Sequence, residues 1–299
     1  MKKLLSDNNK ILMEAAVVER LRRSSHFKLH SKLVNAPLIY DEYGKKALTN
    51  IYQEYADIAE QSKIPLLLCT PTWRANHSRV MSSNVPMSIN RDAVDFLVDF
   101  RSLQENSSNL KIGGLIGCKN DCYQPSEGLS KLEAQNFHSW QIEQLASSKV
   151  DYLIAETLPN VEEALGIAKA MELTGIPYII SFVISRDGLI LDGTTLLDAV
   201  NYIDENTNIN PLGYMVNCIF PSFISPEIQP LALFERLIGC QANASSLDHC
   251  DLEEADNLES NPVSEWGSLM IELNKKYGIK ILGGCCGTNI EHLNYIANH

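Results

Sequence analysis

The sequence lacks a long apolar run. No stretch in its 299 residues approaches the roughly 18 consecutive apolar residues that a membrane-spanning helix needs. The N-terminus has a few lysines followed by polar residues, so it also lacks the apolar core and cleavage site of a signal peptide. With 45% hydrophobic and 21% charged residues, the composition is that of a globular protein. We therefore expect no membrane insertion and a cytoplasmic location.

Positive charge is scarce. Lys and Arg total 25 against 37 Asp and Glu, which gives a formal net charge of −12. The one basic run, Arg20-Leu21-Arg22-Arg23, is short, whereas binding to phosphates requires clustered Lys and Arg. This balance predicts no nucleic-acid partner, and we expect the basic run to form a solvated helix face.

Signs of several domains are missing too. The chain has no low-complexity linker, no short-period repeat and no clear domain boundary, so residues 1–299 are predicted to form one domain. The seven histidines follow no recognisable ligand spacing, and we assign them to surface or core packing. No sequence feature marks an oligomer interface.

Eight cysteines are present in a large chain without an export signal, which favours buried thiols or metal ligands over disulfides. Adjacent cysteines such as Cys285 and Cys286 rarely reach disulfide geometry without strain. Five others are predicted to be buried and to act as small hydrophobic residues. These are Cys69, Cys118, Cys122, Cys240 and Cys250.

Short apolar runs alternate with longer amphipathic segments along the chain. The predicted strands are residues 10–14, 65–70, 111–117, 151–157, 177–184, 213–218, 237–242 and 279–283. The predicted helices are residues 49–61, 90–104, 131–147, 161–174, 194–206, 264–277 and 290–297. Residues 24–44 and 242–262 lack this pattern and are predicted to be long loops. Strand followed by helix, repeated eight times, is typical of a single (β/α)8 TIM barrel of the α/β class.

Three cysteines fall at one end of this predicted barrel. Cys218 ends the sixth strand, and Cys285 and Cys286 follow the eighth. The C-terminal ends of the strands carry the active site in such barrels. Flanking glycines let the backbone turn so that adjacent thiols can face one centre. Because catalytic zinc uses three protein ligands and soft thiolates suit it, we predict a zinc site, with ordinary buried thiols as the alternative.

The pair Asn217-Cys218, followed later by Gly-Gly-Cys-Cys-Gly-Thr, resembles the zinc-binding motif of the homocysteine S-methyltransferase family. This family includes betaine-homocysteine methyltransferases and S-methylmethionine-dependent enzymes. The similarity covers nearly the whole chain. It extends to residues 155–157, 183–193 and 225–227 and to Trp266.

The resemblance implies an enzyme that binds Zn²⁺ through Cys218, Cys285 and Cys286, with no catalytic residue beyond these ligands. Its implied reaction transfers a methyl group from a cationic donor to the thiol of homocysteine, giving methionine. The implied partners are small molecules. Sulfonium and ammonium donors all present an electrophilic methyl group, and the sequence does not choose between them.

The resemblance also implies substrate contacts. Glu156 matches the glutamate that binds the substrate ammonium; alternatively, it caps a helix or pairs with an arginine. After the first strand the family carries Asp-Gly-Gly, whereas this chain has Glu14-Ala15-Ala16. Glu14 keeps the charge, but Ala15 and Ala16 add Cβ atoms where glycine lets the backbone approach a ligand closely.

Two further residues match segments at the site mouth. Trp73 is a candidate to stack on the cationic donor by a cation-π interaction, or else to anchor its loop, and its neighbour Arg74 would then be a surface ion-pair partner. Asn243 occupies the place of a Pro-Asn-Ser-type loop, where its simpler role is to accept a left-handed turn.

Two other functions stay open at this point. The departure at residues 14–16 motivates an acceptor other than homocysteine, such as selenocysteine or another small thiol. A zinc-binding barrel that has lost methyl transfer is the alternative from a different class.

Overall fold

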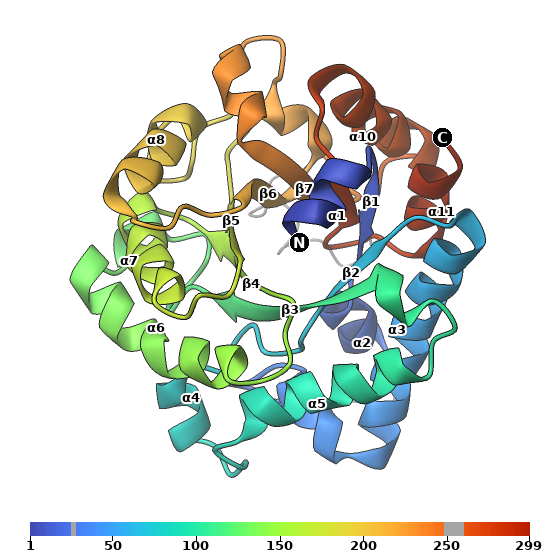
Figure 1. Cartoon of the computed structure of the whole chain (residues 1–299), viewed down its shortest axis with the longest axis vertical. Helices are drawn as coiled ribbons and strands as arrows, with labels where there is room; N and C mark the ends of the chain where they lie inside the picture. Colours follow the sequence, from blue (N-terminus) through green and yellow to red (C-terminus); the bar gives the residue numbers. More distant parts are fainter. Residues whose placement is uncertain (25–27, 248–259) are drawn as a thin grey trace.

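Eight parallel strands close into a barrel in a computed structural model that describes residues 1–24, 28–247 and 260–299. Each strand pairs with the next along the chain, and the last pairs back with the first (Figure 1). The strands are β1 (Ile11–Met13), β2 (Leu66–Cys69), β3 (Leu110–Gly117), β4 (Tyr152–Leu158), β5 (Tyr178–Phe182), β6 (Gly213–Ile219), β7 (Leu237–Ala242) and β8 (Ile281–Gly284). The predicted TIM barrel and its eight strands are confirmed.

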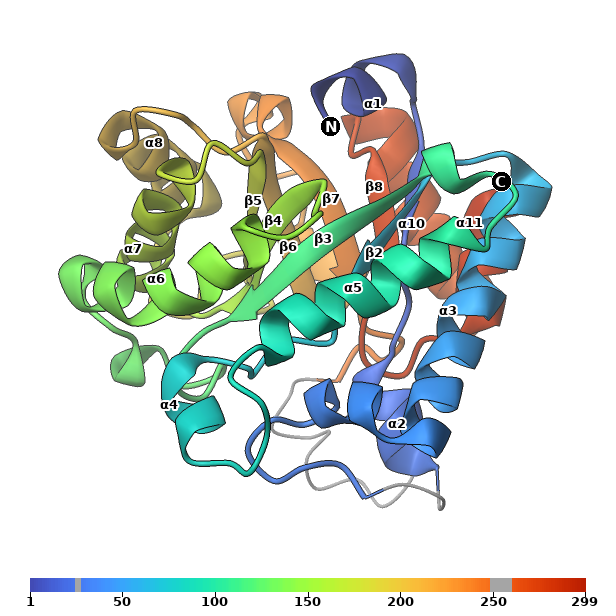
Figure 2. The ribbon, with the colours of Figure 1, turned by 60° about the horizontal axis from the view of Figure 1, so that its bottom comes forward.

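Helices surround this barrel, and the first of them packs across its N-terminal end (Figure 2). They are α1 (Lys2–Asp7), α2 (Val18–Arg23), α3 (Glu42–Ser62), α4 (His77–Met81), α5 (Ile89–Ser102), α6 (Lys131–Ala146), α7 (Val161–Glu172), α8 (Leu196–Asn206), α10 (Val263–Tyr277) and α11 (Ile290–Asn298). Short 3₁₀ helices are η1 (Ala36–Tyr40), η2 (Ser107–Asn109), η3 (Pro125–Glu127), η4 (Pro221–Ile224) and η5 (Leu231–Glu235). Among the described residues, no helix has the length and apolarity needed to cross a membrane.

The predicted eightfold repeat of strand and helix is wrong at one place: no α-helix follows the sixth strand, and none of the predicted helix ranges lies there. Only η4 and η5 connect β6 to β7. Pro221, Pro226 and Pro230 recur at four- and five-residue spacing in this segment, and each removes a helical donor and clashes with the preceding turn.

The loop predicted over residues 24–44 is also partly wrong. It contains η1, and α3 begins at Glu42, seven residues before the predicted start. Asp41 caps α3 by accepting a hydrogen bond from the Gly44 amide. In the polar stretch 242–262, β7 ends at Ala242, residues 243–247 form no helix or strand, and residues 248–259 lie outside the described part.

Side chains inside the barrel form a cluster separate from those that face the helices. The inner cluster contains Ile11, Met13, Leu67, Cys69, Leu115, Tyr152, Ile154, Ile179, Met215 and Ile281. Met1, Leu4 and Leu5 around α1 pack against it and close the N-terminal end of the barrel. Figure 2 shows α1 at the end opposite α2 and α4. Inward-facing polar residues that could contact a ligand are therefore expected at the C-terminal end of the barrel.

Candidate metal and substrate site

Three thiols converge at the C-terminal end of the barrel. The Sγ atoms of Cys218, Cys285 and Cys286 all lie within 4.8 Å of one another, and those of Cys218 and Cys285 are 2.8 Å apart. Cys218 belongs to β6, and the other two directly follow β8. The structure therefore brings together the three cysteines that the sequence predicted as metal ligands.

A backbone irregularity presents Cys218 to its partners. The pairing of β6 with β7 shifts register between Asn217 and Ile219, and Cys218 has a φ of 56°. Such a bulge adds an unpaired residue and re-aims its side chain. Asn217 keeps the inward orientation of Met215 two residues earlier, whereas the shift turns Cys218 toward Cys285.

The glycines beside the second and third cysteines have different roles. Gly287 has a φ of 80°, a backbone conformation that residues with a side chain rarely adopt. Gly283 and Gly284 are needed for close packing: a Cβ would lie 2.8 Å from Met13 Cβ at the first position and 2.2 Å from Thr288 Oγ1 at the second. The predicted turn is thus made by Gly287, and the other two glycines let β8 approach its neighbours.

The three thiols share hydrogen bonds, which separate their pKa values. Hydrogen bonds from Cys218 and Cys285 hold the pKa of Cys286 well below its usual range, and the Arg22 guanidinium acts in the same direction. Hydrogen bonds to its two neighbours, with burial, raise the pKa of Cys218. The contact with Cys218 lowers the pKa of Cys285, but Cys286 and burial outweigh it and the pKa is raised. Two thiols thus stabilise one thiolate, and a cation would stabilise all three as thiolates.

This donor set fits zinc. Soft thiolates favour zinc over harder cations such as magnesium. Structural zinc sites take four protein ligands, whereas catalytic sites take three and keep one position open. The described residues add no fourth Cys, His, Asp or Glu to the group. Three thiols are the number of protein ligands that a catalytic zinc site uses.

Two carboxylates lie at the ends of β1 and β4, and the charge of Glu156 helps to raise the pKa of the Cys285 thiol. Burial raises the pKa of Glu156 to about 7, and its Oε1 lies 3.8 Å from Cys69 Sγ. Glu14 is buried, and its Oε2 accepts a hydrogen bond from the Cys69 amide at 2.7 Å. Burial raises the pKa of Glu14 well above its usual range, against this hydrogen bond and helped by the charge of Glu156.

Neither of the simpler roles considered for Glu156 is found. Helix α7 is capped by the side chain of Asn160, not by Glu156. Among residues 1–24, 28–247 and 260–299, no ion pair involves Glu156. Its carboxylate is left without a cationic partner in the described structure.

Ala15 and Ala16 lie in a buried segment whose backbone forms hydrogen bonds with neighbouring side chains. Ala15 and Ala16 are buried, and neither is among the described residues with positive φ. The Ala16 amide donates to Thr288 Oγ1 at 3.1 Å, and its carbonyl accepts from the Tyr55 hydroxyl at 2.7 Å. This segment needs no glycine for its backbone conformation.

Trp73 and Asn243 both have defined partners at the site mouth. The Trp73 indole donates to Thr157 Oγ1 at 2.8 Å, and the Arg74 guanidinium carbon lies 4.1 Å from the ring centroid. Arg74 is buried and donates to two backbone carbonyls, so its predicted alternative as a surface ion-pair partner is wrong. Asn243 Oδ1 accepts from the Cys286 amide at 3.1 Å and so fixes the backbone of a proposed ligand.

Sequence reasoning missed two residues near the thiols. Tyr123, between β3 and α6, lies close enough that the charge of Cys218, burial and the charge of Cys286 raise the pKa of its hydroxyl. Gln241 precedes Ala242 on β7 and pairs with Asn217 across the strands. Its Oε1 is buried without a hydrogen-bond partner in the described structure. Gln241 could have been found from the alternation of inward and outward residues along its strand. The sequence around Tyr123 contains no pattern that predicts its position.

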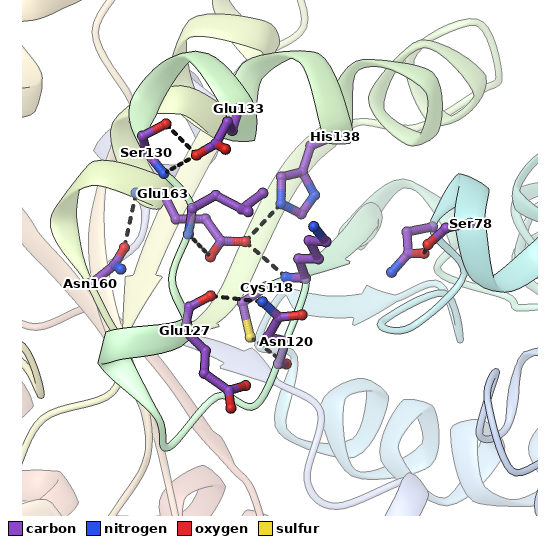
Figure 3. Close-up of polar contacts among 12 residues, drawn as sticks. Ser78, Cys118, Asn120, Glu127, Ser130, Glu133, His138, Asn160 and Glu163 are labelled. Atoms are coloured by element: carbon purple, nitrogen blue, oxygen red, sulfur yellow. Dashed lines mark hydrogen bonds and ion pairs between the residues drawn. The ribbon is translucent and has the colours of Figure 1, made fainter.

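A buried carboxylate holds the loop that carries Tyr123. Glu163 of α7 accepts hydrogen bonds from the amides of Lys119 at 2.8 Å and Leu129 at 3.2 Å, near the two ends of this loop (Figure 3). His138 Nε2 lies 2.9 Å from the same carboxylate. Burial opposes the charge of Glu163, but these hydrogen bonds hold its pKa below the usual range. The loop is thus fixed against the barrel.

Known proteins with similar sequences belong to the family that the cysteine motif resembles. A family model described as homocysteine S-methyltransferase matches residues 11–299. Homocysteine S-methyltransferase YbgG of Bacillus subtilis is 26% identical over 96% of this chain and 93% of its own length. S-methylmethionine–homocysteine S-methyltransferase BHMT2 of Mus musculus is 27% identical over 63% of this chain, and the match spans about half of that relative, 54%.

Solved structures show the same fold. Homocysteine methyltransferase MmuM of Escherichia coli superposes with a TM-score of 0.77 in its oxidized form and 0.76 in its metallated form. In both, the sequence identity is 17%, and the match covers at least 98% of this chain and 97% of the other. Since the family model spans nearly the whole sequence, the chain belongs to the homocysteine S-methyltransferase family.

Proposed function

We propose that this protein transfers a methyl group from a sulfonium or ammonium donor to the thiol of homocysteine in a zinc-dependent reaction that gives methionine. The observation that carries the proposal is the convergence of three thiols at the barrel mouth, near a carboxylate that has no cationic partner among the described residues. The names of the three similar proteins described above each include homocysteine together with methyltransferase.

Cys218, Cys285 and Cys286 would hold the zinc ion. When bound, zinc supplies the Lewis acidity that keeps a substrate thiol deprotonated near neutral pH. Glu156 would bind the substrate ammonium, because its carboxylate is near the thiols and lacks a partner of opposite charge in the described structure. Holding both ends of the substrate fixes its sulfur for in-line attack, which lowers the entropic part of the barrier.

The reaction balances without a covalent enzyme intermediate. The acceptor thiol releases its proton to water, and a lone pair of its sulfur forms the new bond to the methyl carbon. The donor keeps the electron pair of the broken bond and leaves as a neutral molecule. Trp73 is a candidate contact for the cationic donor through the face of the ring opposite Arg74, which covers the first face.

A different small thiol, or selenocysteine, is the second candidate acceptor. The observation that favours it is the hydrogen bond from the Cys69 amide to Glu14 Oε2. This bond occupies one carboxylate oxygen, so fewer acceptor positions of Glu14 are available to a substrate. The same three thiols and Glu156 would serve either acceptor.

Two measurements test the proposal. Homocysteine incubated with S-methylmethionine, S-adenosylmethionine and betaine in turn should give methionine with at least one donor, and other thiols should react more slowly. Zinc content should fall strongly in Cys286→Ser but stay at the wild-type level in Cys240→Ala, a buried thiol of β7 outside the cluster. No methionine with any donor, together with turnover of another thiol, would shift the assignment to the second acceptor. Equal zinc in both variants would remove the ligand assignment.

A further inference from the structure

Asn217 joins three adjacent strands of the barrel. Its Oδ1 accepts hydrogen bonds from the Thr157 amide of β4 at 2.9 Å and from the Ser181 hydroxyl of β5 at 2.6 Å. The orientation of the side-chain amide is fixed by chemistry, because a backbone N–H can only donate and must face the oxygen. Asn217 is only 2% exposed, so these bonds lie in a medium where losing them is costly.

Both ends of this connection are irregular. The pairing of β4 with β5 shifts register between Ala155 and Leu158, as β6 does beside Asn217. Thr157 has a φ of 58° and Cys218 has a φ of 56°. Residues other than glycine held in this region cost of order 1–3 kcal/mol each and persist only when their surroundings fix them. Asn217 supplies an acceptor to the Thr157 amide at one bulge and forms part of the backbone of the other.

The two bulges carry the two groups that would hold the substrate. Glu156 directly precedes Thr157, and Cys218 directly follows Asn217. We propose that Asn217 is a positioning residue that sets the separation between the metal-binding thiolate of Cys218 and the ammonium-binding carboxylate of Glu156. This inference rests on the proposed function.

A fixed separation selects the length of the acceptor. Homocysteine has one methylene more between its thiol and its ammonium-bearing carbon than cysteine has, so a rigid span that fits the first leaves the second short. Thr157 Oγ1 also accepts from the Trp73 indole, which extends the same framework to the candidate donor contact. Loosening Asn217 should therefore weaken metal binding, weaken homocysteine binding and reduce the preference for homocysteine over cysteine.

The test uses the full chain and the variants Asn217→Ala and Asn217→Ser. Alanine removes the acceptor, and the shorter serine hydroxyl cannot span both donors. Gln144→Ala is the matched control, because this buried amide of α6 donates to the Met87 carbonyl at 2.9 Å in the outer helix layer. Cobalt(II) affinity is measured by chelator competition, and homocysteine and cysteine are then titrated against the thiolate-to-cobalt absorption bands.

Both Asn217 variants are expected to bind cobalt about 10- to 100-fold more weakly, as for other residues that orient metal ligands. They should also bind homocysteine more weakly relative to cysteine, whereas the control should lose thermal stability only. The serine variant decides if the alanine variant fails to fold. Cobalt and homocysteine affinities both within about twofold of wild type, or a change in only one of them, would overturn the proposal. The readout needs no methyl transfer, so an inactive wild type would refute the proposed function and still leave this test intact.

Discussion

At the residue scale, the ionisation of Glu156 controls whether the site can hold a positively charged substrate group. Burial raises the pKa of this carboxyl to about 7, so a large fraction is neutral at neutral pH when no ligand is bound. A bound ammonium favours the charged form and lowers the pKa again. The site therefore becomes fully charged only when its substrate arrives.

This coupling predicts the pH dependence of substrate binding. Below about pH 7 the free carboxyl gains a proton and loses its attraction for the ammonium, so the KM for homocysteine should rise as the pH falls from 8 to 6. Glu156→Gln should raise KM at pH 8 by roughly tenfold or more, since hydrogen bonds to charged groups contribute about 1.5–3 kcal/mol.

The variant also serves as the control, because metal-assisted loss of the thiol proton weakens binding at low pH in both proteins. The ratio of the two KM values should therefore shrink toward 1 as the pH falls to 6. A ratio that stays constant across this range would show that Glu156 does not bind the ammonium.

How far individual residues could be predicted depends on whether their role follows from residue type and strand position. Cys285 was predictable because adjacent thiols between glycines at a strand end suit metal binding better than core packing. The role of Asn217 was not, although it stands beside Cys218 in the motif, because its hydrogen bonds depend on a bulge in β4. Tyr123 belongs to a loop whose path is fixed by Glu163, 40 positions later in the chain.

At the element scale, helix ends show the same dependence on local backbone conformation. Helix α3 ends at Lys63 with a φ of 56°, and α10 ends at Gly278 with a φ of 74°. Both residues are in the left-handed conformation that terminates helices, but only glycine adopts it without steric cost. One helix thus ends with the favourable residue and the other with an unfavourable one.

This difference predicts opposite effects of two reciprocal substitutions. Lys63→Gly should stabilise the protein by about 0.5–1 kcal/mol, and Gly278→Ala should destabilise it by about 1 kcal/mol. Lys63 is exposed, and a Cβ at Gly278 would meet no atom within 4 Å, so neither change disturbs packing. Urea unfolding of both variants beside wild type measures the effect. Changes of the same sign would show that backbone conformation does not control stability at these two helix ends.

Element positions were predictable where one physical signal dominated. The eight strands are apolar on both faces and short, so their locations could be recognised from the sequence. Helix α1 was not predicted, because it has only six residues and its two leucines acquire a partner only when the barrel closes. The absence of an α-helix between β6 and β7 agrees with the predicted helix ranges, none of which lies there, and the three prolines of this segment give the physical reason.

At the scale of the whole molecule, the two ends of the barrel differ: one carries the candidate site and the other is closed by apolar packing. The thiols and carboxylates lie at the C-terminal end, where register shifts, positive φ values and buried charges all reduce stability. The N-terminal end has Leu4 and Leu5 of α1 packed on the inner cluster, and Lys280 Nζ donates to the Leu5 carbonyl at 2.7 Å. Strain at the mouth is compatible with folding because the rest of the barrel is well packed.

This separation predicts that the N-terminal end can be weakened without altering the site. Leu4→Ala combined with Leu5→Ala removes half-buried leucines and should lower the free energy of unfolding by roughly 2–3 kcal/mol, less than two fully buried leucines would cost. Zinc content and homocysteine KM should stay at wild-type values, because α1 lies at the end of the barrel opposite the thiols. Lys2→Ala with Lys3→Ala, two exposed positions on the same helix, is the matched control and should change neither quantity. A loss of zinc that accompanies the loss of stability would mean that the mouth depends on packing along the whole barrel axis, and the two ends could not then be treated as independent.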